Sequence, residues 1–201
     1  MWPKDVEIKY MVEQSGNSTQ QNLEGIAIRE VYDTNEPVIV FRWVRGDSCG
    51  IFENAGYLDR NDQIIFMTPD CDNVPAIAHL LMHRLGFTHE INHPNRDEFV
   101  MIFEDNIAED ERRHFVKYEE DEYPKLYDFD AKSIMHYQYD DFQEDALLPV
   151  IIPLIRDISP FDFLRPVWEK RSAPRQVFSY GDLIKLKDAF SKLILPGPVT
   201  G

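Results

Sequence analysis

The sequence predicts a single α+β domain, on three observations. Residues 6–10 alternate between apolar and polar side chains, and residues 38–44 are rich in β-branched and aromatic ones, which is typical of strands. Residues 73–86 and 179–193 have the caps and apolar spacing expected of helices. With 201 residues and 43% hydrophobic content, the chain is long enough for one domain with a sizeable core.

Between these elements the pattern is less regular. Residues 18–32 have the pattern of an amphipathic helix, and residues 49–66 that of two short strands joined through turns. Residues 106–118 predict a short helix. Residues 146–174 are rich in proline and aromatic side chains without a clear period, so we expect an ordered loop there.

The helix within residues 73–86 has clear signals at both ends. Asn73 is a suitable N-cap, Pro75 suits the first turn, and Gly86 accepts the left-handed conformation that ends a helix. His79 and His83 lie four residues apart, so a helix places both imidazoles on one face.

A third histidine follows the predicted turn. Because the chain reverses at Gly86, His89 can return toward His79 and His83. Three neutral imidazoles with one open position are the ligand set of a catalytic rather than a structural zinc. The alternative is a helix with two histidines on a half-buried face; the third histidine and the glycine favour the metal site.

The histidine run resembles the metzincin signature H-E-x-x-H-x-x-G-x-x-H, and residues 86–90 are similar to its astacin branch. The resemblance continues in residues 94–100, 104–107, 127–129 and 133–137, which are similar to the astacin motifs P-D-R-D-D-Y-V, E-N-I, Y-D-Y and S-I-M-H-Y. Residues 2–3 and 179–182 fit the two ends of the family's domain. The resemblance therefore spans nearly the whole chain.

The resemblance implies a two-lobed metallopeptidase domain. The upper lobe, about residues 1–89, would hold a mixed twisted sheet and the zinc-site helix. The lower lobe, about residues 90–201, would be mostly irregular, with a C-terminal helix. An edge strand of the sheet, for which residues 50–56 are the candidate, would pair with extended substrate.

The resemblance also assigns roles at the site. His79, His83 and His89 would bind Zn²⁺. Met135 would form the Met-turn, an apolar floor beneath the metal. Tyr137 would be a further, switchable metal ligand that helps to stabilise the transition-state oxyanion.

Glu90 has a structural role in the family, where it meets the buried N-terminus of the mature enzyme. The alternative is a solvated glutamate that happens to follow a ligand. No signal peptide follows Met1, so we expect a domain without its signal and propeptide.

Leu80 departs from the family pattern. Family members have a glutamate there, the general base that moves a proton from the zinc-bound water to the leaving amine. Leucine can do neither, and such a base typically contributes about 10²–10⁴-fold in rate. No acidic residue lies one helical turn from position 80, and a rescue by Asp97 or Glu98 has no support from spacing. Leu80 is either a natural replacement or an engineered one.

The chain has two cysteines, Cys49 and Cys71. From the residues alone they could be a free buried thiol pair; the resemblance implies a disulfide, which in turn implies an oxidising, extracellular location. A second disulfide of the family is missing, because Val38 and Lys192 occupy its positions. The sequon at Asn17 adds a little to the prediction of a secreted protein.

The formal net charge of −15 excludes some partners. Such a field repels nucleic acid phosphates and anionic membranes. No apolar stretch is long enough to span a bilayer. The acidic runs at residues 119–122 and 140–141 are expected to be solvated surface, with a preference for basic peptides as the alternative.

Three functions remain open from the sequence. The first is a pseudoenzyme that binds zinc and a peptide or protein but is catalytically impaired. The second is an active zinc endopeptidase with a residual or rescued base. The third is a metal-free interaction scaffold, which the intact trio of histidines argues against.

Overall fold

The structure is a computed structural model that describes residues 8–13, 29–31, 35, 37–46, 49–51, 55–58, 62–119, 127–137, 141–154 and 177–190. The chain divides into two units. Unit 1 holds Met1–Thr88 and Lys170–Gly201, and unit 2 holds His89–Glu169.

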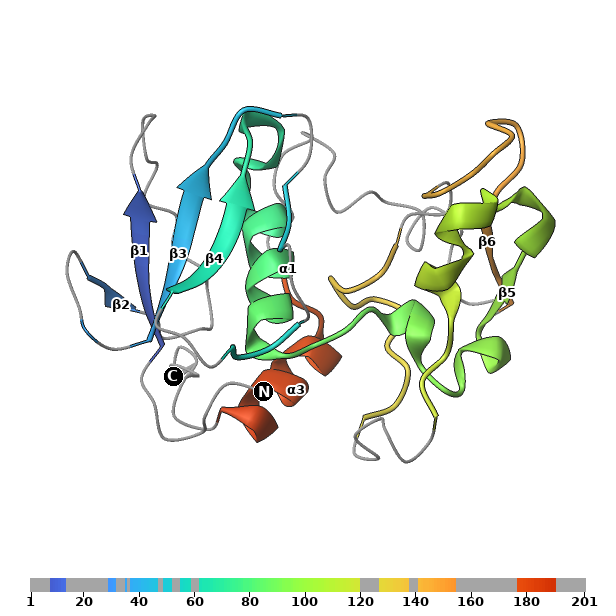
Figure 1. Ribbon diagram of the computed structural model, residues 1–201. Helices are drawn as coiled ribbons and strands as arrows, with labels where there is room; N and C mark the ends of the chain where they lie inside the picture. The colour runs from blue at the N-terminus through green and yellow to red at the C-terminus, as the bar shows by residue number, and fades with distance from the viewer. Residues whose placement is uncertain are drawn as a thin grey trace. The chain divides into compact units, whose positions relative to one another are not determined.

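Unit 1 is built on a four-stranded sheet in the order β2-β1-β3-β4 (Figure 1). Its strands are β1 (Lys9–Glu13), β2 (Arg29–Glu30), β3 (Val38–Trp43) and β4 (Asp62–Met67), and all three pairings are parallel. Gly50 adds an antiparallel bridge to Phe66 at the β4 edge, so the pairing is mixed as predicted.

Burial explains why these residues form strands. The central strand β3 buries Val38 through Phe41 without alternation, as expected of a strand covered on both faces. Strand β4 instead alternates, with Gln63, Ile65 and Met67 buried. Side chains of the sheet therefore form a large part of the unit 1 core.

Helix α1 (Val74–Leu85) lies beside β4 and begins and ends where the sequence predicts (Figure 1). The Asn73 side chain accepts a hydrogen bond from the Ala76 N–H at 3.0 Å, and Gly86 ends the helix at a φ of 104°. The buried Arg84 fixes the helix to the sheet, because its Nε and Nη2 both donate to the Ile64 carbonyl.

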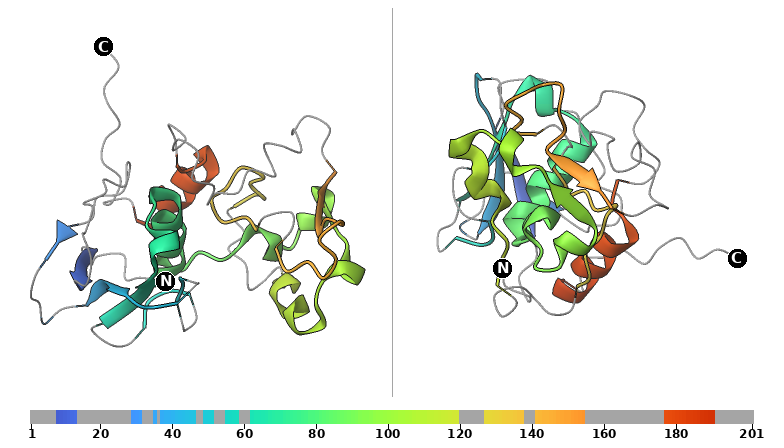
Figure 2. Two further views of the ribbon diagram at one scale, coloured as in Figure 1. Left: turned by 90° about the horizontal axis from the view of Figure 1, so that it is seen from above. Right: turned by 90° about the vertical axis from the view of Figure 1, so that its right-hand side faces the viewer.

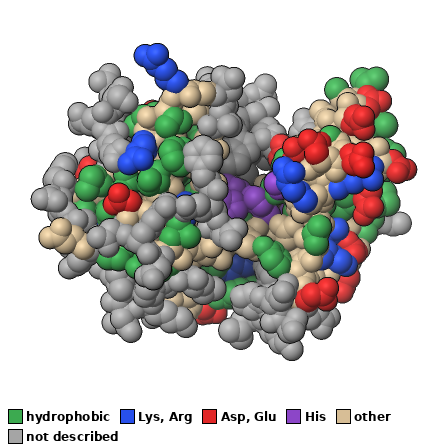
Figure 3. Space-filling view, in the orientation of Figure 1, with side chains coloured by type: hydrophobic (Ala, Val, Ile, Leu, Met, Phe, Trp, Pro, Cys, Tyr) green, Lys and Arg blue, Asp and Glu red, His purple; other side chains and the backbone are tan. Residues whose placement is uncertain are grey.

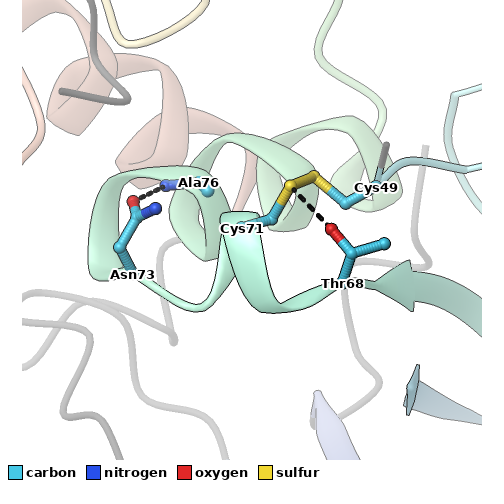
Figure 4. The surroundings of a disulfide bond; sticks show 5 residues. All are labelled: Cys49, Thr68, Cys71, Asn73 and Ala76. Atoms are coloured by element: carbon cyan, nitrogen blue, oxygen red, sulfur yellow. Dashed lines mark hydrogen bonds between the residues drawn. A yellow bond between two sulfur atoms is a disulfide. The ribbon is translucent and has the colours of Figure 1, made fainter. Parts of the chain in front are cut away.

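The predicted disulfide is present. Cys49 and Cys71 are bonded, with their Cα atoms 6.2 Å apart. Cys71 ends the short 3₁₀ helix η1 (Pro69–Cys71), two residues before the N-cap of α1 (Figure 4). Thr68 lies against the bond, its hydroxyl 3.6 Å from the Cys71 sulfur. The bond therefore ties the entry of α1 to the chain around Gly50.

The last helix, α3 (Tyr180–Ala189), has a capping box in which Ser179 and Asp182 exchange side-chain and backbone hydrogen bonds. The sequence predicts it to about residue 193; residues beyond 190 lie outside the described part. The lobe boundaries expected at about residues 1–89 and 90–201 stay a prediction; by its contacts this helix belongs to unit 1. The ring contact of Phe190 with Phe87, at 6.4 Å between centroids, shows why.

Unit 2 is mostly irregular, as predicted. Strands β5 (Val100–Ile102) and β6 (Ile151–Pro153) pair antiparallel and lie side by side in Figure 2. The remaining elements are the 3₁₀ helices η2 (Glu90–Asn92), η3 (Arg96–Glu98), η4 (Glu104–Asn106) and η5 (Glu109–Phe115). They surround an apolar core of Ile91, Val100, Ile107, Phe115, Phe129, Val150 and Ile151.

Several predicted elements differ from the structure. The helix expected over residues 18–32 is wrong at its end, where β2 pairs with β1 and the Val31 N–H donates to the Tyr10 carbonyl at 2.9 Å. Residues 18–28 are outside the described part. The short helix expected over 106–118 is present as the 3₁₀ helix η5, shorter than predicted, and the chain is extended from Val116. The loop expected over 146–174 contains β6.

No helix among the described residues is long and apolar enough to cross a membrane.

Removing the Cys49–Cys71 bond should lower the free energy of unfolding by about 3 kcal/mol, because the open chain gains the loop entropy that the bond removes. Urea denaturation of a Cys49→Ser/Cys71→Ser double variant measures this loss. Reductant should lower the unfolding midpoint of the unmodified protein and leave that of the double variant unchanged. Equal midpoints for the two proteins under non-reducing conditions contradict the prediction.

Candidate metal centre

His79 and His83 project from one face of helix α1. Their imidazole rings meet edge to face, with centroids 4.6 Å apart. His79 is buried and His83 is half-buried. Histidine side chains reach the surface in the space-filling view (Figure 3). The caps at Asn73 and Gly86 fix the ends of the helix and hence the orientation of this face.

The surroundings of His83 keep its ring neutral and oriented. Its Nδ1 lies 3.0 Å from the Phe87 carbonyl, which can only accept, so Nδ1 carries the proton and Nε2 is left with its lone pair. Burial, followed by the proximity of His79, lowers the pKa of His83 to about 3. A neutral imidazole with a fixed tautomer is the form that binds a metal ion.

The turn after α1 brings the third histidine to the first two. The Gly86 N–H donates to His83 and the Phe87 N–H to Met82, which closes the end of the helix. The ligand nitrogens of His79, His83 and His89 all lie within 4.8 Å of one another. Three imidazoles within reach of one ion fit Zn²⁺, whereas Mg²⁺ and Ca²⁺ take oxygen ligands.

Leu80 follows the first of these histidines on α1. Its side chain is only 5% exposed. The whole helix, from Val74 to Leu85, contains no aspartate or glutamate. The helix that supplies two imidazoles therefore supplies no carboxylate.

In unit 2, Tyr137 packs against His89. Their ring centroids are 4.2 Å apart at a tilt of 45°. Burial, followed by the nearby charge of Asp141, raises the pKa of Tyr137 above its ordinary value, so the ring is a neutral phenol. The expected role of Tyr137 as a switchable ligand stays a prediction.

Met135 and Glu90 are joined through the backbone. The Glu90 N–H donates to the Met135 carbonyl at 3.0 Å, and the Met135 N–H donates to the Ser133 hydroxyl at 3.0 Å. Met135 is 1% exposed. The turn that carries Met135 is therefore fixed next to the residue that follows His89, while its role as a floor beneath the metal stays a prediction.

Glu90 is 1% exposed, so the alternative of a solvated glutamate is wrong. Its Oε2 accepts a hydrogen bond from the Asp130 N–H at 3.0 Å. The contact with the N-terminus that the resemblance implies involves residues outside the described part.

One feature near the site is not predictable from the sequence. Phe142 has a φ of 65°, and its ring lies 5.0 Å from that of Tyr137. A glycine or asparagine would have signalled such a conformation, but a phenylalanine does not.

Comparisons with known proteins bear on the family and the fold of the chain. Residues 1–190 match the family model of astacin, a peptidase family. The chain is 33% identical over 166 residues to Tolloid-like protein 2 of Mus musculus, covering 76% of this chain and 16% of that protein. It is 30% identical over 171 residues to the zinc metalloproteinase nas-14 of Caenorhabditis elegans, covering 76% of this chain and 32% of that protein. The chain thus spans a third or less of the length of these relatives.

Among solved structures, the chain is similar to high choriolytic enzyme 1, a hatching enzyme zinc-protease from Oryzias latipes. The TM-score is 0.68 at 23% identity, with 92% of each chain covered, which supports the fold. The family match over residues 1–190 and the trio of histidines lead to one conclusion: this chain belongs to the astacin family and forms an astacin-like zinc metalloprotease domain.

Proposed function

We propose that this domain binds zinc and a peptide or protein segment but cleaves it inefficiently, as a pseudoprotease. The observation that carries the proposal is Leu80, which stands directly after the first histidine of the trio, where the family signature has its glutamate. His79, His83 and His89 would hold the ion.

Bound zinc would supply a Lewis acid that polarises a carbonyl and lowers the pKa of a bound water to roughly 7. What the chain lacks is the group that takes and returns the proton. An aliphatic side chain at position 80 accepts no proton, so the general-base contribution of about 10²–10⁴-fold is lost.

Two acidic side chains that follow the trio in sequence have other partners. Glu90 is buried and accepts from the Asp130 backbone. Asp97 forms ion pairs with Lys117 at 2.6 Å and Arg96 at 3.1 Å, and the hydrogen bond from Lys117 lowers the pKa of its carboxyl. These contacts support the view that neither residue replaces the missing base.

A peptide or protein segment is the proposed ligand. The bridge between Gly50 and Phe66 marks an edge of the unit 1 sheet, and an extended peptide adds to such an edge through backbone hydrogen bonds. Unit 2 contains 21 acidic and 8 basic residues, and acidic side chains are prominent on its surface in Figure 3. This charge argues against nucleic acid and anionic membranes as partners.

We assign the domain to a secreted, extracellular protein. The Cys49–Cys71 bond supports this assignment, because disulfides persist in oxidising compartments.

Purified protein should contain one zinc ion per chain, since three neutral imidazoles supply the ligands. His83→Gln should weaken zinc binding by at least tenfold, measured by competition with a chromophoric chelator. The control is His93→Gln, which alters a buried histidine whose Nε2 lies 3.0 Å from the Tyr127 carbonyl. Equal zinc content in His83→Gln, His93→Gln and the unmodified protein contradicts the site, and zinc-free unmodified protein favours the metal-free scaffold.

Leu80→Glu should raise kcat/KM on a peptide library by about 10²–10⁴-fold, because it restores a general base beside the metal. Leu80→Gln is the matched control. Glutamine has nearly the same shape as glutamate, but its amide is too weakly basic to accept the proton. Chelator should abolish the gain. The proposal fails if Leu80→Glu is no faster than Leu80→Gln although both bind zinc.

A further inference from the structure

Phe142 has the only positive φ, 65°, of any non-glycine residue in the part of the chain that the structure describes. A bulky residue rarely adopts this conformation, because its Cβ crowds the neighbouring carbonyl oxygen. Such an outlier persists only where the surrounding structure holds it, and it directs attention to the side chain that it places.

Backbone contacts hold Phe142 and the residue that follows it. Its carbonyl accepts a hydrogen bond from the Ala108 N–H at 3.3 Å. The next residue, Gln143, forms an antiparallel bridge with Ile107. The segment after η4 thus acts as a template for the backbone around Phe142.

The buried Asn106 fixes the residues that follow. Its carbonyl accepts from the Glu144 N–H at 2.9 Å, and its Oδ1 accepts from the Asp145 N–H at 2.8 Å. Its Nδ2 donates to the Leu148 carbonyl at 2.7 Å. This one amide satisfies several backbone groups of the loop and so holds the chain just after Phe142 in place.

The strained backbone directs the Phe142 ring into an aromatic cluster. The ring lies 5.0 Å from Tyr137, 5.7 Å from Phe115 and 4.9 Å from His114, on which it stacks. Tyr137 in turn lies 4.2 Å from His89. A continuous series of ring contacts therefore connects the loop that Asn106 holds to the third histidine of the trio.

We propose that Phe142 is a positioning residue for the metal centre: its ring, held by a strained backbone, keeps Tyr137 packed against His89. The inference rests on the proposed zinc-binding role of His79, His83 and His89. Phe142 has no role in proton transfer. It limits the rotation of the Tyr137 ring, which limits the orientation of the His89 imidazole.

The test uses two variants and a matched control. Phe142→Gly relieves the backbone strain and deletes the ring, whereas Phe142→Leu keeps an apolar side chain without an aromatic face. The control is Phe99→Leu, because Phe99 packs on the same core but stacks on Phe129, with centroids 4.7 Å apart. Any effect of general destabilisation should appear in the control as well.

The first readout is the ring-proton resonances of His89 by NMR in chelator-treated protein, identified by their loss in His89→Asn. Both Phe142 variants should shift these resonances, because the ring current of Tyr137 moves with its ring; Phe99→Leu should leave them in place. This readout needs no zinc, so it stands even if the zinc proposal fails. The second readout is zinc affinity, expected to fall about tenfold in both Phe142 variants and to stay within twofold in the control.

Unshifted His89 resonances in folded Phe142→Gly or Phe142→Leu overturn the proposal, as does an equal shift in Phe99→Leu. If neither Phe142 variant folds, the proposal is tested by through-space NMR cross-peaks between ring protons of the unmodified protein. Tyr137 should show them to the rings of both His89 and Phe142, and their absence overturns the proposal.

Discussion

The left-handed turn at Gly86 is the constraint on which the metal centre depends. Helix α1 alone can bring only His79 and His83 to one ion, because a third residue on that face would continue along the axis. Gly86, at a φ of 104°, stops the helix and leaves the His83 carbonyl to accept from the N–H groups of Gly86 and Gly56. The chain then reaches His89 within three residues. A residue with a Cβ would be strained at this φ.

The surroundings of the trio hold one imidazole in a metal-binding form, and helix α1 contributes no carboxylate beside it. Burial and His79 keep His83 neutral, and Phe87 sets its tautomer. Leu80 is buried on the same helix, and an aliphatic side chain at such a site stabilises the fold by about 1.5–3 kcal/mol through removal of its surface from water. A glutamate there would carry the cost of burying a carboxylate next to the metal-binding face. A leucine at position 80 therefore favours the stability of the fold over catalytic turnover.

The sequence predicted the features that depend on neighbouring residues, and it failed for those that depend on contacts between distant residues. The ends of α1 were confirmed because Asn73 and Gly86 act on hydrogen bonds within a few residues of themselves. The failure at β2 arose because its pairing with β1 joins residues about 20 positions apart, which an amphipathic pattern does not encode. The grouping of α3 with unit 1 is likewise not encoded locally, since Phe87 and Phe190 are distant in sequence. Asn106 is bonded to the residues just after Phe142, an interaction across nearly 40 positions, and no residue near position 142 signals its conformation.

The central claim is that this chain has a zinc site without an effective base. Its most direct test is mass spectrometry of a complex peptide mixture incubated with the unmodified, zinc-loaded protein, beside an aliquot treated with chelator. We expect at most slight zinc-dependent cleavage, so that the two aliquots yield nearly the same peptides, while metal analysis finds one zinc per chain in the first. Extensive cleavage that occurs only in the zinc-loaded aliquot contradicts it.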